Sequence, residues 1–172
     1  MLIWEIIVVV GVVLIDIATK VLAALFMREK ISLIDGVFSF VYVENTGASF
    51  GMMKGQRWLF VAITVVALMV MLFWLAKNKK AHRLARIAML LIAGGAFGNM
   101  FDRIVYGYVR DFLYFELINF PVFNVADCAL TVGVTLLVIY VLFIYKEPQK
   151  DLSSGAEEKS DNEGVSNDGT QL

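Results

Sequence analysis

Apolar residues fill four long runs of the chain, separated by shorter polar stretches. A helix needs roughly 20 apolar residues to cross a hydrocarbon core of about 30 Å, and each run reaches that length or comes close to it. The runs cover about Leu2–Met27, Trp58–Ala76, Leu84–Val105 and Val122–Tyr145. The pattern predicts an integral membrane protein, mainly α-helical, with a bundle of four transmembrane helices.

The polar linker between the first two runs contains a different pattern. Residues 37–43 read VFSFVYV, rich in β-branched and aromatic side chains, and they follow an Asp35-Gly36 turn signal. Because open sheet edges are not tolerated against lipid, we expect one or two short strands outside the membrane. They would form a small extracytoplasmic β-sheet cradle at about residues 31–55.

The composition changes abruptly after Tyr145. Residues 146–172 hold seven acidic and three basic side chains and almost no large apolar ones. Such a segment cannot bury enough apolar surface to order itself. We therefore expect a membrane domain at residues 1–145 and an acidic, disordered cytoplasmic tail at residues 146–172.

The first apolar run could also be a cleaved signal peptide. A signal peptide begins with basic residues, whereas the first charged residue here is Glu5. Asp16 and Lys20 then interrupt the run, which is unlike the uninterrupted apolar core of a signal peptide. We expect a retained helix.

Basic residues in short loops predict the orientation. The loop between the second and third runs, residues 77–86, carries five Lys and Arg residues, and dense positive charge stays in the cytoplasm. With four spans, both termini would then be cytoplasmic and the cradle would face outward. The basic residues do not form the clustered face of a nucleic-acid-binding module, so no nucleic-acid partner is expected.

Two aspartates, Asp111 and Asp127, flank the last run at its predicted outer end. Ionisable groups at membrane depth are costly and usually persist because chemistry or transport needs them. Two carboxyl groups in a poorly hydrated site can share one proton and act as an acid and a base. The structural alternatives are a surface aspartate in a loop and a helix-capping aspartate.

Further polar residues recur at helical spacing in the same predicted half of the membrane, so that within each run they share a face. Clustering on facing helices would relieve the cost of placing them in lipid. Each could instead be structural, as an interfacial pair or a lysine reaching the headgroups. They are Asp16 and Lys20 in the first run, Asn99, Asp102 and Arg103 in the third, and Asn124 in the fourth.

Small residues four apart, Gly94 and Gly98, lie in the third run. Such a pair lets two helix backbones approach closely. We interpret it as a packing feature that also draws the polar end of this helix against its neighbours.

Other nucleophiles are less favoured. Ser49 lies in a literal G-x-S-x-G match, but that motif requires a histidine partner, and the sole histidine, His82, lies in the loop predicted at the opposite membrane face. The same separation argues against a Cys128–His82 pair and against a transition-metal site. We expect carboxylate chemistry with no metal and no other cofactor.

Five segments together resemble a known family. They are residues 16–20 (DIATK), 45–50 (NTGASF), 98–103 (GNMFDR), 109–112 (VRDF) and 123–127 (FNVAD). In this order, at the expected ends of the spans, they are similar to bacterial lipoprotein signal peptidases, the type II signal peptidase family of membrane aspartyl proteases. The resemblance covers about residues 2–145. Arg110 is more basic than expected at its position, which leaves the electrostatics there open.

The resemblance implies a catalytic pair, Asp111 and Asp127, in a four-helix membrane bundle with a small outer cradle. It implies removal of the signal peptide from prolipoproteins, just before a cysteine that carries a diacylglyceryl group. The site would lie near the outer face of the bacterial cytoplasmic membrane, with membrane lipids around a monomer and no cofactor. The supporting positions would be Asp16, Lys20, Asn45, Asn99, Asp102, Arg103 and Asn124.

A small proton-coupled transporter or channel subunit is the alternative function, because it would use the same buried carboxyl groups as a relay. The second run is wholly uncharged and the polar residues gather toward one face, so no polar path is expected to cross the membrane. The peptidase interpretation is therefore favoured.

Overall fold

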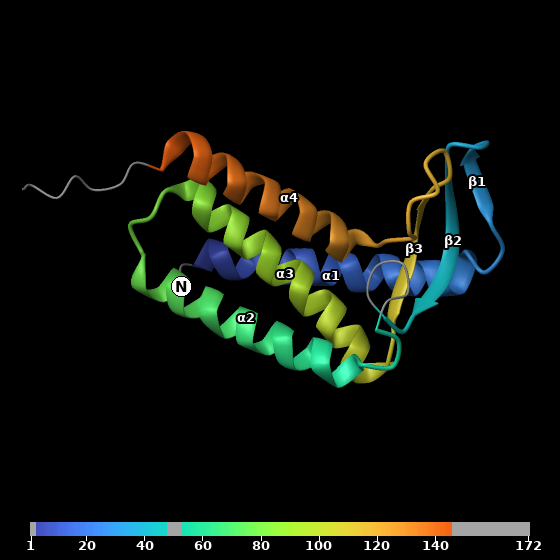
Figure 1. Ribbon diagram of the computed structural model, residues 1–172, viewed down its shortest axis with the longest axis horizontal. Helices are drawn as coiled ribbons and strands as arrows, with labels where there is room; N and C mark the ends of the chain where they lie inside the picture. Colours follow the sequence, from blue (N-terminus) through green and yellow to red (C-terminus); the bar gives the residue numbers. More distant parts are fainter. Residues whose placement is uncertain (1–2, 48–52, 146–172) are drawn as a thin grey trace, which may run out of the picture.

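The computed structural model describes residues 3–47 and 53–145. Its long helices are α1 (Ile3–Phe26), α2 (Arg57–Lys77), α3 (Arg83–Val105) and α4 (Val125–Ile139), and a π-helical turn, Tyr140–Ile144, extends α4. All four are long and apolar enough to span a membrane. They lie side by side, with the start of α1 and the end of α4 at the same end of the bundle (Figure 1). The predicted four-helix bundle is confirmed, whereas the predicted tail lies outside the described residues.

The central helix of the bundle is α3. Within its most apolar window 56% of the residues are buried, against 11–17% in the other three helices. Small residues make this position possible: a Cβ on Gly94 would lie 2.9 Å from the Val12 side chain, and one on Gly95 would lie 2.4 Å from the Ala126 carbonyl oxygen. The predicted close approach at Gly94 is confirmed. The helices α2 and α4 lie on either side of α3 (Figure 1).

A three-stranded antiparallel sheet stands at the far end of the bundle, in the order β1 (Ile31–Ile34), β2 (Phe38–Asn45) and β3 (Val109–Phe115). The first two strands fall within the predicted cradle and turn at Gly36, whose φ is +71°. The third strand was not predicted. It follows α3 and hydrogen-bonds to the edge of β2 that would otherwise be unpaired.

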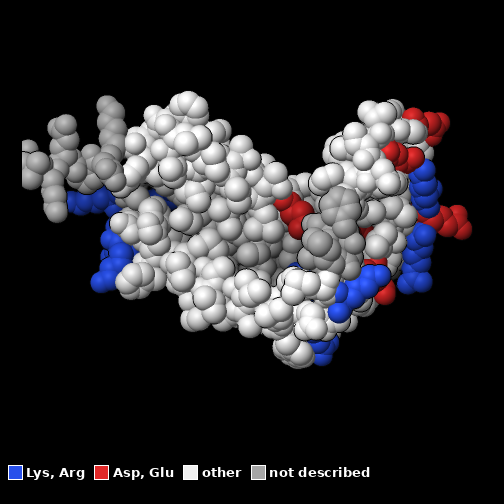
Figure 2. Space-filling model, viewed as in Figure 1, with Lys and Arg blue, Asp and Glu red and all other residues white. Residues whose placement is uncertain are grey.

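Charged side chains gather toward the two ends of the molecule on the face shown in Figure 2, and the middle is mostly uncharged. This distribution suits a bundle whose flanks contact hydrocarbon. Acidic atoms also lie away from the ends, at the bottom of a hollow between the helices and the sheet (Figure 2).

A buried ion pair at the other end of the bundle was not predicted. Arg86 is only 4% exposed, and its Nε donates to Glu5 Oε1 at 2.7 Å. Its Nη1 donates to the Asn78 and Leu75 carbonyl oxygens at 2.6 and 3.2 Å, so one guanidinium joins α1, α3 and the end of α2. Arg86 is therefore not a loop charge as the sequence suggested, although the other four basic residues of the loop are exposed.

Arg86→Met should lower the free energy of unfolding by about 3–5 kcal/mol, because it leaves the Glu5 carboxylate buried without its guanidinium. Thermal unfolding of the detergent-purified protein measures this loss. Arg83→Met removes an exposed charge from the same helix turn and is the matched control. Glu5→Gln combined with Arg86→Met should recover part of the loss. Equal stability of Arg86→Met and Arg83→Met would contradict a stabilising role for the Glu5–Arg86 ion pair.

Candidate active site

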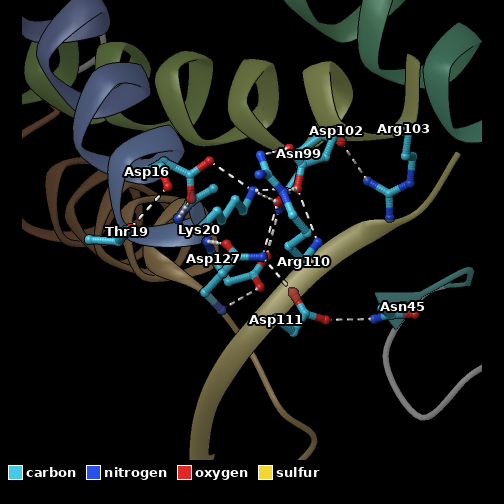
Figure 3. Close-up of polar contacts among 12 residues, drawn as sticks. Asp16, Thr19, Lys20, Asn45, Asn99, Asp102, Arg103, Arg110, Asp111 and Asp127 are labelled. Carbon is cyan, nitrogen blue, oxygen red and sulfur yellow. Dashed lines mark hydrogen bonds and ion pairs between the residues drawn. The ribbon is translucent and has the colours of Figure 1, made fainter. Parts of the chain in front are cut away.

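A polar cluster lies where the sheet meets the ends of three helices (Figure 3). Its members come from segments far apart in the sequence, so only the fold brings them together. All the predicted site residues take part in it. They are Asp16 and Lys20 on α1, Asn45 on β2, Asn99, Asp102 and Arg103 on α3, Asp111 on β3, Asn124 as the residue that caps α4, and Asp127 in its first turn.

Asp127 is held by a capping box at the start of α4. The Asn124 side-chain oxygen accepts from the Asp127 amide at 3.0 Å, and Asp127 Oδ2 accepts from the Asn124 amide at 3.1 Å. Because of this cap α4 begins at Val125, three residues later than the sequence suggested. The other oxygen, Oδ1, accepts from Asn99 Nδ2 at 2.7 Å. The positive end of the helix dipole stabilises negative charge here, and Asp127 takes part in the helix cap that the sequence analysis gave as the structural alternative.

Asp111 is 2% exposed on β3, between two amide donors. Asn45 Nδ2 on the neighbouring strand donates to its Oδ2 at 2.9 Å, and Asn124 Nδ2 donates to its Oδ1 at 2.6 Å. Burial raises the pKa of the Asp111 carboxyl to about 7; the negative charge of Asp127 acts in the same direction, and the Asn45 hydrogen bond opposes it. Asp111 is thus not an ordinary surface aspartate.

A single residue, Asn124, donates hydrogen bonds to both carboxyl groups. Its side-chain amide contacts Asp111 and its backbone amide contacts Asp127. The same side-chain amide also donates to Asn99 Oδ1 at 3.1 Å, and Asn99 in turn donates to Asp127. Hydrogen bonds of Asn99 and Asn124 therefore link the two carboxyl groups. An acid–base pair requires such mutual placement.

Four ionisable groups lie behind this arrangement. Lys20 Nζ lies 2.8 Å from Asp16 and 3.5 Å from Asp102, and it donates to Asn99 Oδ1 at 2.9 Å. Arg110 pairs with Asp102 at 2.7 Å. All are buried. Two cations balance two anions, which keeps the cost of burial low and fixes the Asn99 side chain that contacts Asp127.

Asp102 and Arg103, adjacent on α3, contact different partners. Adjacent helix residues point in different directions, so Asp102 faces Arg110 and Lys20 while Arg103 faces the loop after β2. Arg103 Nη2 donates to the Gly47 carbonyl oxygen at 3.2 Å. Its guanidinium lies 4.9 Å from the centre of the Phe60 ring on α2. Arg103 thus links α3 to the cradle and to α2.

Arg110 is a functional neighbour that the sequence marked only as unexpectedly basic. Both its backbone amide and its guanidinium donate to the Asp102 carboxylate, at 2.7–3.1 Å. Alternation along a strand could have found it, because Arg110 and Asp111 must point to opposite faces of β3. That argument needs the strand, which the sequence did not predict.

The two acids line a cleft of about 920 Å³ between α2, the start of α4 and the sheet. Its polar lining includes Asn45, Asn99 and Arg103 in addition to the acids, and apolar residues such as Phe60 and Val132 make up much of the remainder. The hollow in Figure 2 with acidic atoms at its bottom lies in this region. A cleft with polar groups on its floor and apolar walls suits an extended, largely apolar ligand.

A Cys128–His82 pair is not supported. His82 accepts from the Leu84 amide at the start of α3 and stacks on Tyr140, at the opposite end of the bundle from Cys128. Ser49 lies outside the described residues. Within residues 3–47 and 53–145, no three His, Cys, Asp or Glu side chains are placed to hold a metal ion.

Comparisons with known proteins agree with the family resemblance noted in the sequence. The family profile described as signal peptidase (SPase) II matches residues 8–143. A lipoprotein signal peptidase of Symbiobacterium thermophilum is 44% identical over 139 residues, covering 78% of this chain and 91% of the relative. One from Clostridium tetani is 41% identical over 143 residues, covering 80% and 92% of the two chains.

A solved structure has the same fold. It is described as a bacterial membrane enzyme determined by the in meso method at 2.3 Å resolution. It is 30% identical in sequence, with a TM-score of 0.76, and the match covers 84% of this chain and 93% of the other. The four helices and the small sheet are therefore arranged as in a known membrane enzyme.

Gly98→Ala should destabilise the cluster, because a Cβ there would lie 2.5 Å from Asp16 Oδ2. We expect a loss of about 1–3 kcal/mol in thermal unfolding, as in overpacked cores. Gly11→Ala on α1 is the control, since nothing lies within 4 Å of its Cβ. Equal unfolding temperatures for the two variants would show that the contact with Asp16 is not tight.

Proposed function

The chain belongs to the signal peptidase (SPase) II family, and we propose that Asp111 and Asp127 are the acid and base with which it removes signal peptides from prolipoproteins. The observation that carries this proposal is the shared donor, Asn124, which contacts both carboxyl groups on the floor of the cleft. The proposed bond cleaved lies just before a cysteine that bears a diacylglyceryl group.

The two acids differ in surroundings, which supports different starting states for them. Asp127 lies half-buried at the start of α4, where the helix dipole and two N–H donors stabilise the anion. Asp111 is buried and its pKa is raised to about 7. Asp111 therefore carries the shared proton and Asp127 acts as the base. Because the two carboxyl groups interact, the proton belongs to the pair.

Peptide hydrolysis then needs only these two groups and one water. Asp127 takes a proton from the water as the water oxygen attacks the scissile carbonyl carbon, and Asp111 gives its proton to the carbonyl oxygen. When the tetrahedral intermediate breaks down, the C–N bond breaks and Asp127 passes its proton to the leaving amine. Asp111 recovers its proton from the re-forming carbonyl. Asn45, Asn99 and Asn124 hold the two carboxyl groups in place.

The cleft suits a substrate that arrives within the membrane. Because α3 lies between α2 and α4, the cleft is bounded by Phe60 and Thr64 on one side and by Thr131 and Val132 on the other. Val132 is half exposed on the outer flank of α4. Acyl chains and an apolar signal helix could thus reach the cleft from the lipid without crossing a polar surface.

The positions of the charges support the predicted orientation. The exposed basic residues Lys77, Lys79, Lys80 and Arg83 lie between α2 and α3, at the end opposite the sheet. With that loop in the cytoplasm, the start of α1 and the end of α4 lie there too and the acid pair lies near the outer face of the membrane.

A transport function is less favoured. The polar cluster lies at one end of the bundle and the Glu5–Arg86 pair at the other. Within the described part of α2 between Trp58 and Ala76 no residue is charged. A proton relay needs a continuous polar path across the membrane, and the described residues of α2 do not provide one.

Asp111→Asn and Asp127→Asn should each lower kcat/KM by about 10³-fold or more, because each removes one partner of a two-residue acid–base step. The assay is cleavage of a lipidated precursor peptide by the purified protein in detergent. Asp35→Asn, an exposed aspartate in the β1–β2 turn, is the control and should keep full activity. Turnover retained by either site variant would remove the pair from the mechanism.

The pH profile reports on Asp111. If its protonated form is required, activity falls as pH rises through about 7, the pKa of this carboxyl. Asn45→Ala removes a hydrogen bond that lowers this pKa, so the alkaline limb of kcat/KM should move to higher pH. A shift to lower pH, or an alkaline limb unmoved by the substitution, would show that Asp111 is not the group that titrates.

A further inference from the structure

A second pocket, of about 490 Å³, lies at the end of α1, beside the face of β2 and β3 opposite the acid pair. Tyr108 and Arg110 of the β3 segment and Tyr42 and Glu44 of β2 line it, and Arg110 and Glu44 are cross-strand partners. The Tyr42 amide donates to the Met27 carbonyl oxygen at 2.9 Å. This bond ties the pocket to the end of α1, so the site is already formed.

The pocket offers an unused cation, Arg28. Its Nε donates to the Ala24 carbonyl oxygen at 3.2 Å, which fixes the guanidinium over the last turn of α1. Its two terminal nitrogens have no partner among the described residues, and the side chain is exposed. A guanidinium held in this way presents two parallel N–H donors, the geometry that binds phosphate oxygens.

The pocket also offers an anion. The Glu44 side chain is exposed, accepts hydrogen bonds from the Tyr42 hydroxyl (3.5 Å) and the Tyr108 hydroxyl, and has no ion-pair partner among the described residues. The second arginine of the pocket is not free to balance it, because Asp102 takes up the Arg110 guanidinium and the Tyr106 ring lies 4.4 Å from it. Arg28 and Glu44 thus leave one positive and one negative charge for a ligand.

The surface below the pocket is apolar. Val21 and Leu25 of α1 line the pocket, and they continue into the exposed flank of that helix. Three tyrosines surround the polar part, as is common where a membrane protein meets the headgroup layer. A ligand with a charged head and apolar chains matches both parts at once.

We propose that this pocket binds the headgroup of a phosphatidylethanolamine-type phospholipid, with its phosphate on Arg28, its ammonium group on Glu44 and its acyl chains along α1. The ammonium group supplies N–H donors that a choline headgroup lacks, and a headgroup with only negative charge gives Glu44 no cationic partner. The site lies behind the strands that carry Asn45 and Asp111, and it does not depend on the proposed reaction.

Native mass spectrometry of the full-length detergent-purified protein tests the site. The protein is offered equal amounts of dioleoyl phosphatidylethanolamine and dioleoyl phosphatidylglycerol. Arg28→Gln should lower retention of phosphatidylethanolamine about tenfold, since a charge-assisted phosphate contact is lost. Glu44→Gln should abolish the preference for it over phosphatidylglycerol. Lys54→Gln, which removes an exposed cation outside the pocket, should change neither value.

Three results would overturn the proposal. One is equal retention of the two lipids by the unaltered protein. Another is retention by Arg28→Gln equal to that by Lys54→Gln. The third is displacement of the lipid by millimolar inorganic phosphate, because the pocket would then bind a free anion and not a lipid head. Thermal unfolding of each variant confirms that the compared proteins are folded.

Discussion

Burying charge in a membrane protein is affordable only if every charge is paired, and this constraint organises the structure. Lys20 links Asp16, Asp102 and Asn99, Arg110 closes the group on Asp102, and no net charge remains. Asn99, which this network holds in place, donates a hydrogen bond to Asp127, and Asn124 donates hydrogen bonds to both Asp127 and Asp111. These hydrogen bonds hold the acid pair in position.

The fold serves this cluster directly. Glycines on α3 bring α1 and α4 close enough for Asp16 to accept from the Ala126 amide at 2.9 Å, next to the start of the helix that bears Asp127. The sheet supplies Asn45 and Asp111 from neighbouring strands. Arg103 donates a hydrogen bond from α3 to the loop after β2, so a polar contact joins the cradle to the helix bundle. The membrane-facing flanks contribute length and apolar surface only.

Much of this could be predicted from the sequence, and the failures have a common cause. Apolar run length predicts the four helices, and local spacing predicts that Asn99 and Asp102, or Asn124 and Asp127, share a face. The missed features are pairings across long sequence separations: β3 on β2, Arg110 on Asp102 along an unpredicted strand, and Arg86 on Glu5. The partners of Arg103 were not predicted, because helical spacing limits direction but does not choose among neighbours from other elements.

The central claim is that Asp111 holds the proton of the acid pair near neutral pH. Infrared difference spectroscopy, which detects the C=O stretch of a protonated carboxyl, measures this in the resting protein as pH is varied. We expect a protonated carboxyl band that disappears with a midpoint near pH 7 and that is absent from the Asp111→Asn variant. A spectrum without that band above pH 5, or a band that persists in Asp111→Asn, would contradict the assignment.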